Sequence, residues 1–205
     1  EERLKENLDE IAALLRRERE SSETAIDFLM IAKYYERIGD HASYIAHIAN
    51  EMHDDHTDFS QEAWDELNVV MEAVREEINL TCTAFKNDDK EIAQRVAPLG
   101  VVISSLCDEL KLHHVERLSD GTCGLEEGTV FTDILNCFNR IATHCASTMV
   151  ALMQSGEVYQ EVHIHNSKVH PTDTKEYHMY FNEYNQKYDL KTIGKVLSME
   201  PEEVE

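Results

Sequence analysis

Two carboxylates and an imidazole lie within one short run of the sequence, YYERIGDHASYIAHI, at residues 34–48. Glu36 and Asp40 are four residues apart, so a helix would place them on one face, where like charges repel. A bound cation would turn that repulsion into shared ligation, because carboxylate oxygens suit hard cations. Gly39 would let a neighbouring helix approach. The spacing therefore has two interpretations, a cation site or a solvent-facing pair beside an apolar stripe.

The four-residue spacing is not specific by itself, because salt-tolerant acidic pairs are common on helix surfaces. The same spacing recurs at Glu2/Glu6, Asp58/Glu62, Glu62/Glu66 and Glu72/Glu76. A functional interpretation of Glu36 and Asp40 therefore needs support from outside the spacing.

Apolar residues recur with a helical period along almost the whole chain, which predicts helices. We therefore expect these side chains to be held on a helix. No run with the two-residue period of a strand stands out, and 7 Gly and 3 Pro are few breakers for 205 residues. Cap residues at 21–23, Ser60 and the turn at 87–89 mark expected helix boundaries. The helices expected from this pattern span about 2–19, 22–53, 60–86, 90–118, 126–155 and 172–188, with a last turn at 192–197.

The turn at 87–89 divides the chain into two halves that look related. Residues 35–42 align with residues 138–145, and an aromatic residue, an Arg, an Ile and a His recur in register. Both copies fall on the second expected helix of their half, which favours a tandem repeat. The fold class predicted is all-α, with two tandem three-helix bundles and a shortened last helix. The predicted domains are residues 1–87, residues 88–190 and a tail at residues 191–205.

The charge balance limits the partners. Asp and Glu number 41 against 19 Lys and Arg, a formal net charge of -22. Such a surface repels nucleic acid and anionic lipid headgroups, so no nucleic-acid partner is expected. The five cysteines form no CxxC pair. They indicate reduced thiols and not a disulfide framework or a zinc site.

Targeting signals are not evident in the sequence. No segment approaches the roughly 18 apolar residues of a membrane span, and no signal peptide is visible. The sequence begins at Glu1, inside an expected helix and without an initiator Met. We therefore expect the chain to be a fragment of a longer protein.

The run Glu36-Arg37-Ile38-Gly39-Asp40-His41-Ala42 resembles the signature of PhoU domains, which are tandem three-helix bundles linked to bacterial phosphate uptake. Further stretches resemble the PhoU-like domain at the cytoplasmic C-terminal end of bacterial Na/Pi cotransporters. These stretches are residues 114–118 with 121–123, residues 131–135 with 144–145, and residues 181–188.

This resemblance implies a function. The chain would be a non-catalytic domain that modulates a sodium-dependent phosphate transporter, covalently linked to the transporter's membrane domain. It would lie at the cytoplasmic face of the bacterial inner membrane.

The resemblance also implies a metal site. An ExxxD motif on PhoU bundle helices can bind a metal cluster, and Glu36 and Asp40 match it. Their partners would come from the preceding helix, with Glu6 and Glu10 as candidates. The implied ion is a divalent or iron cation, namely Fe, Zn, Mg, Ca or Mn. In the second half, the positions where the family has acids carry Gly100, Ser104, Asn139 and Thr143, which indicates that a second metal site is lost.

Basic residues recur at matched positions of the two halves: Arg37 with Arg140, and His41 with His144. A helix His more often packs through a hydrogen bond than ligates a metal. The arginines are expected to pair with acids across the bundle, and phosphate binding through the bidentate guanidinium fork is the alternative.

Two C-terminal features have their own interpretations. His163, His165 and His170 could bind nickel or zinc, although no Cys or carboxylate follows at zinc spacing. The helically spaced aromatics are expected to dock the last helix on the bundle, with a partner or homodimer surface as the alternative. These aromatics are Tyr177, Tyr180, Phe181, Tyr184 and Tyr188.

No sequence motif favours catalysis. GxSxG, P-loop, HExxH and GxGxxG patterns are absent from the sequence. The runner-up function is a free-standing PhoU regulator of a phosphate ABC transporter and its sensor kinase. A metal-storage or redox bundle is the third, and the missing acids and the absence of an ExxH pair speak against it.

Overall fold

The computed structural model describes residues 2–154 and 174–190, and every regular element in these ranges is a helix. The predicted all-α class is therefore confirmed. The helices are α1 (Glu2–Asp55), α2 (Gln61–Asn87), α3 (Lys90–Ser119), α4 (Leu125–Gln154) and α5 (Lys175–Lys187).

The first helix differs from the sequence prediction. The expected turn at residues 21–23 is wrong, because α1 continues through these residues as one helix. Cap residues such as Ser permit a helix to begin but do not force one to stop. Inside a helix they cost only a few tenths of a kcal/mol each, whereas Gly or Pro would cost about 1 or 3 kcal/mol. The remaining boundaries, including the Ser60 cap, fall within two or three residues of the predicted ones.

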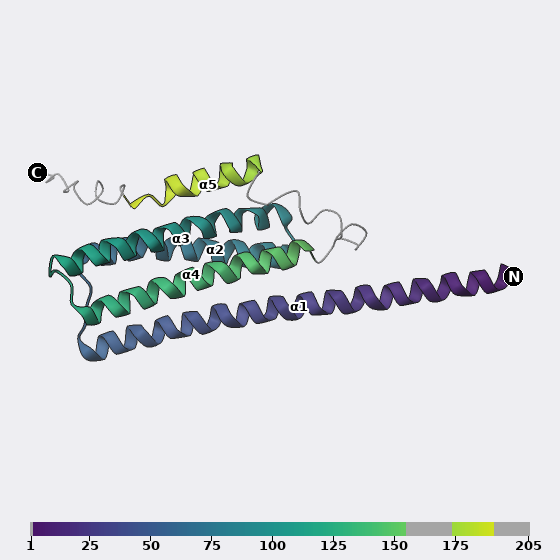
Figure 1. The fold of residues 1–205 in the computed structure, drawn as a ribbon, viewed down its shortest axis with the longest axis horizontal. Coiled ribbons are helices and arrows are strands. Elements are labelled where there is room, and N and C mark those ends of the chain that lie inside the picture. Colours follow the sequence, from purple (N-terminus) through teal and green to yellow (C-terminus); the bar gives the residue numbers. More distant parts are fainter. Residues whose placement is uncertain (1, 155–173, 191–205) are drawn as a thin grey trace, which may run out of the picture.

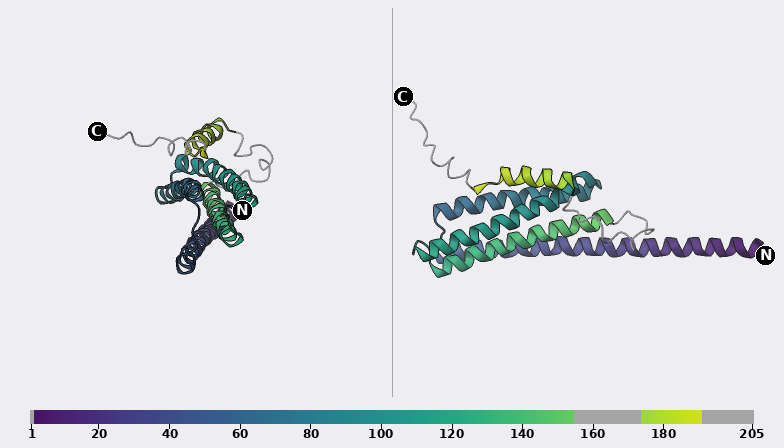
Figure 2. Two further views of the ribbon diagram at one scale, coloured as in Figure 1. Left: turned by 90° about the vertical axis from the view of Figure 1, so that its left-hand side faces the viewer. Right: turned by 45° about the horizontal axis from the view of Figure 1, so that its top comes forward.

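Three helices pack mutually and two flank them. α2, α3 and α4 each contact the other two, α1 packs along α4, and α5 packs on α3. The N-terminal part of α1 projects far beyond the other helices (Figures 1 and 2). At 1.5 Å per residue its 54 residues extend about 80 Å, almost twice the length of α3.

One connected core joins the helices from both predicted halves. Its centre is formed by fully buried residues such as Val70, Leu99 and Leu135, and it extends to Ile38 on α1 and Tyr184 on α5. Burying such a side chain contributes about 1.5–3 kcal/mol. The predicted domain boundary falls at the α2–α3 turn. The division into two bundles stays a prediction.

Local signals fix the ends of the central helices. The Ser60 side chain accepts a hydrogen bond from the Ala63 backbone N–H at 3.2 Å, which caps α2. Asp89 caps α3 by accepting from the N–H groups of Glu91 and Ile92. Asp88 between them adopts the left-handed conformation, with φ of 51°, which Asp tolerates better than most residues.

The last helix docks as its aromatic pattern predicts. Tyr184 is buried, and Arg95 on α3 lies over the Tyr180 ring at 4.9 Å. Arg95 also forms an ion pair with Glu183 at 2.9 Å. The aromatic stripe of α5 is therefore a packing surface. Within the described ranges, no helix has both the length and the apolar character to cross a membrane.

Candidate ion-binding seam between α1 and α4

The structure brings the two matched motif segments together where α1 packs along α4. Tyr34 and His41 are seven residues apart on α1, so they lie about two turns apart on one face. The His144 ring of α4 stacks against both of them, with ring centroids 6.0 Å from Tyr34 and 5.8 Å from His41. We call this contact, with its neighbours Arg37 and Arg140, the seam.

Basic groups crowd one another at the seam. The pKa of His144 is lowered, first because the ring is partly buried and then by the positive charges of His41, Arg37 and Arg140. In the described part of the chain neither arginine belongs to an ion pair, so the predicted pairing with acids is not found there. The rings of His41 and His144 stack against each other, and their role stays a prediction.

The two carboxylates that match the ExxxD motif lie beside the seam. Glu36 and Asp40 are exposed, and both line a surface groove of about 390 Å³ with Lys33, Arg37 and His41. A Cβ added at Gly39 would have nothing within 4 Å. The close helix approach expected at Gly39 is therefore absent from this arrangement.

The groove offers fewer ligands than a metal cluster needs. Among the side chains that the structure describes, which begin at residue 25, no group of three or more His, Cys, Asp or Glu could hold a metal ion. Glu6 and Glu10 stand on the same continuous helix as Glu36, about 45 and 39 Å from it along the axis, and their role as its partners stays a prediction. Mg²⁺ keeps several waters and binds through one or two carboxylates. Glu36 and Asp40 thus fit one hydrated divalent cation, and their role as ligands stays a prediction.

The positions interpreted as a lost second site carry no acid of their own, but one of them lies beside an acid from another helix. The Thr143 hydroxyl donates to the Asn139 carbonyl at 2.8 Å. Gly100 is partly buried and lies against the Glu77 carboxyl of α2. Ser104 is partly buried on α3.

Sequence reasoning missed Glu77, which is fully buried. Neither of its carboxyl oxygens has a hydrogen-bond partner. Burial holds the pKa of Glu77 well above its usual range. The sequence pattern could have revealed this residue, because Glu77 continues the buried stripe of α2 after Val70 and Val74. An acid at such a position departs from the rule that a stripe is apolar.

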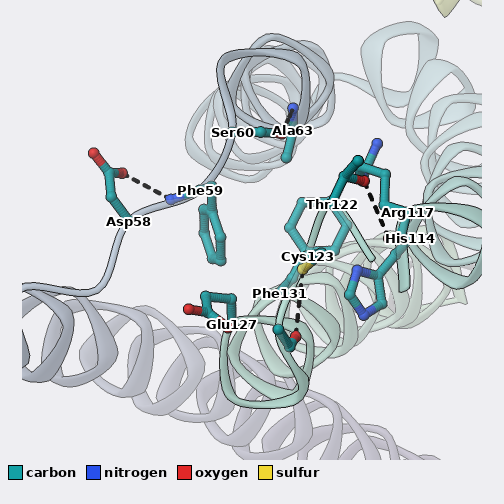
Figure 3. Close-up of a pocket in the computed structure, with 11 residues that line it drawn as sticks. Asp58, Phe59, Ser60, Ala63, His114, Arg117, Thr122, Cys123, Glu127 and Phe131 are labelled. Carbon is teal, nitrogen blue, oxygen red and sulfur yellow. Dashed lines mark hydrogen bonds between the residues drawn. The ribbon is translucent and has the colours of Figure 1, made fainter. Parts of the chain in front are cut away.

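A second unassigned feature is a cavity of about 90 Å³ at the end of the bundle where the α1–α2 and α3–α4 connections meet (Figure 3). Arg117 lies there over the Phe131 ring at 5.4 Å. Its guanidinium donates to Glu66 at 2.8 Å, and His113 bonds the same carboxylate. This buried ion pair ties α2 to α3. The lining residues are Asp58, Phe59, Ser60, Ala63, His114, Arg117, Thr122, Cys123, Gly124, Glu127 and Phe131.

Two groups of predicted features remain, the C-terminal histidines and the cysteines. His163, His165, His170 and the turn at 192–197 lie outside the described ranges. All five cysteines are free, which agrees with reduced thiols.

Comparison with known proteins bears on the motif at the seam. Residues 1–49, which include the ERIGDHA run, match the family model described as PhoU domain. No curated protein and no solved structure matches the chain. The resemblance to the PhoU family that the sequence predicts is therefore confirmed, through the segment that carries Glu36, Asp40 and His41.

Proposed function

We propose that this chain is the regulatory, non-catalytic domain of a sodium-dependent phosphate transporter, at the cytoplasmic face of a bacterial membrane. The PhoU match supports a role in regulating phosphate transport at the level of the family. The observation that carries the proposal is the seam, where the two matched motif segments meet through His41 and His144.

The seam can act as a switch because its charges are unbalanced. Basic groups crowd one side, and Glu36 and Asp40 repel each other in the adjoining groove. A hydrated divalent cation held by these carboxylates would supply the charge that relieves their repulsion. An ion that binds more tightly when α1 lies on α4 favours that arrangement by its difference in affinity. The long α1 helix would carry this change to the attached transporter.

The proposal is tested by neutralising the two carboxylates in the intact protein. The double variant Glu36→Gln/Asp40→Asn is compared with wild type for the initial rate of phosphate uptake, at equal membrane levels of the protein. The matched control is Glu51→Gln/Asp55→Asn, because these residues are exposed on the same helix at the same spacing. We expect the first variant to change the rate and the control to leave it unchanged. Equal rates for all three proteins would refute the switch.

The covalent link to a transporter is tested separately. We expect the reading frame upstream of Glu1 to encode several apolar segments of about 20 residues each. A start codon within one short helix would instead indicate a free-standing regulator.

A further inference from the structure

The carboxyl group of Glu77 occupies a position that water does not reach. Glu77 has 0 % relative exposure in the middle of α2. Both of its oxygens are buried without a hydrogen-bond partner. A Cβ added at Gly100 of α3 would lie 2.8 Å from Glu77 Oε1 and 3.8 Å from the Ala142 carbonyl oxygen of α4. The carboxyl therefore lies between all three central helices, in the room that the missing side chain of Gly100 leaves.

Among the described residues, no cation balances a charge at this position. The only influence resolved on the pKa of Glu77 is burial, which raises it. The titratable group that faces it from α4 is Cys145, whose pKa is raised to about 12 by burial and by Glu77, so this thiol stays neutral. Gly100, its contact on α3, has no side chain to titrate. The pKa of Tyr35 on α1 is also raised, first by burial and then by Cys82 and Cys145.

An ionised carboxylate without a partner is too costly to bury, so such a group takes up a proton instead. A metal ion is not an alternative, because no group of ligands surrounds this part of the described chain. A proton is the one ligand that needs no added room.

We propose that Glu77 is a proton-binding site in the core, and that loss of its proton loosens the packing of α2 against α3 and α4. The protonated carboxyl lets the three helices close around it. The ionised form places an unpaired charge among them, and the helices must separate until water reaches it. This site lies in the core and does not depend on the seam or on the proposed transporter.

The sign of the pH dependence follows from linkage. The folded state binds the Glu77 proton more tightly than the unfolded chain does. The folded state therefore loses stability relative to the unfolded chain as pH rises above about 4.5, the ordinary pKa of a Glu carboxyl. The contribution of Glu77 to stability is therefore intact below about pH 4.5 and is lost as pH rises. The folding equilibrium constant falls by up to about tenfold per pH unit until the folded-state pKa is reached.

The test compares wild type with Glu77→Gln by urea unfolding from about pH 5 to about pH 8. The control is Glu109→Gln, which removes an exposed carboxylate of α3. We expect the ratio of the wild-type folding constant to that of Glu77→Gln to fall by tenfold or more over this range, and the corresponding ratio for Glu109→Gln to stay constant. A pH-independent ratio for Glu77→Gln would overturn the proposal.

A second variant and a direct measurement guard against failure to fold. Glu77→Met replaces the carboxyl by an apolar side chain of similar length and serves the same comparison if the Gln variant does not fold. In wild type, infrared spectroscopy at neutral pH should show the absorption of an unhydrated protonated carboxyl. Absence of that band in folded wild type would contradict the proposal without any variant.

Discussion

At the scale of single residues, burial decides which charged groups matter. Glu66 and Arg117 are nearly buried and paired, whereas Glu72 and Arg75 form an exposed pair. An acid–arginine pair therefore contributes differently to stability at a buried and at an exposed position. Breaking a buried pair strands a charge away from water, and breaking an exposed pair leaves both partners hydrated.

We therefore predict that Arg117→Ala lowers the free energy of unfolding by about 3–5 kcal/mol, because Glu66 keeps a buried charge. Arg75→Ala, its exposed counterpart, should change the same quantity by no more than about 1 kcal/mol. Urea unfolding measures both. Similar losses in the two variants would mean that His113, which bonds the same carboxylate, compensates the Glu66 charge by itself.

A second prediction at this scale concerns the loss of stability at low pH. The pKa of His144 is lowered by burial and by the neighbouring positive charges. The unfolded chain therefore takes up this proton more readily, and stability falls as pH drops below the ordinary His pKa of about 6.5. His144→Gln should reduce that loss, and His53→Gln, at an exposed position, should not. Urea midpoints at about pH 7.5 and pH 5.5 give the comparison. An unchanged pH dependence in His144→Gln would contradict the crowding at the seam.

At the scale of elements, helix positions and caps could be predicted from periodicity and from Ser60. The continuity of α1 could not, because Ser21 and Ser22 favour a helix start but cost too little inside a helix to break one. The docking of α5 followed from its aromatic spacing. The position of Glu77 in the core required knowing which face of α2 is buried. The meeting of His41 with His144 required knowing that α1 packs along α4, which one helical period does not specify.

We expect Gly→Ala substitutions at two helical positions to change stability in opposite directions. Gly39→Ala should stabilise the protein by about 0.5–1 kcal/mol, because Ala is the better helix former and space is open there. At Gly100 the added methyl would press on the buried Glu77 carboxyl, and overpacking typically costs about 1–3 kcal/mol. Thermal unfolding of the two variants should therefore separate them by a free energy of that size. An equal gain in both would show that the space beside Glu77 is not filled.

The docking of α5 depends on its one buried aromatic ring. Tyr184→Ala should remove the buried ring that anchors α5 on the core, so α5 should lose amide protection while α2 and α4 keep theirs. Hydrogen exchange followed by mass spectrometry resolves the elements. Tyr180→Ala, at a partly exposed position of the same helix, is expected to have the smaller effect. Loss of protection throughout the bundle would instead place α5 within the global folding unit.

At the scale of the whole molecule, three features bear on function: the acidic composition, the projecting α1 helix and the seam. The net charge of -22 disfavours nucleic acid as a partner. The packing of α1 along α4 joins the segment that matches the PhoU family to the second half of the chain. Regulation of phosphate transport is the role that we propose for the chain.

The most direct test of that claim is phosphate uptake by host cells that lack the gene, compared with cells in which wild type or the Glu36→Gln/Asp40→Asn variant is restored. Initial rates are measured at low and high external phosphate. We expect restoring wild type to change the rate or its dependence on phosphate, and we expect the double variant not to reproduce the wild-type response. Identical uptake in all three strains would contradict the proposed role.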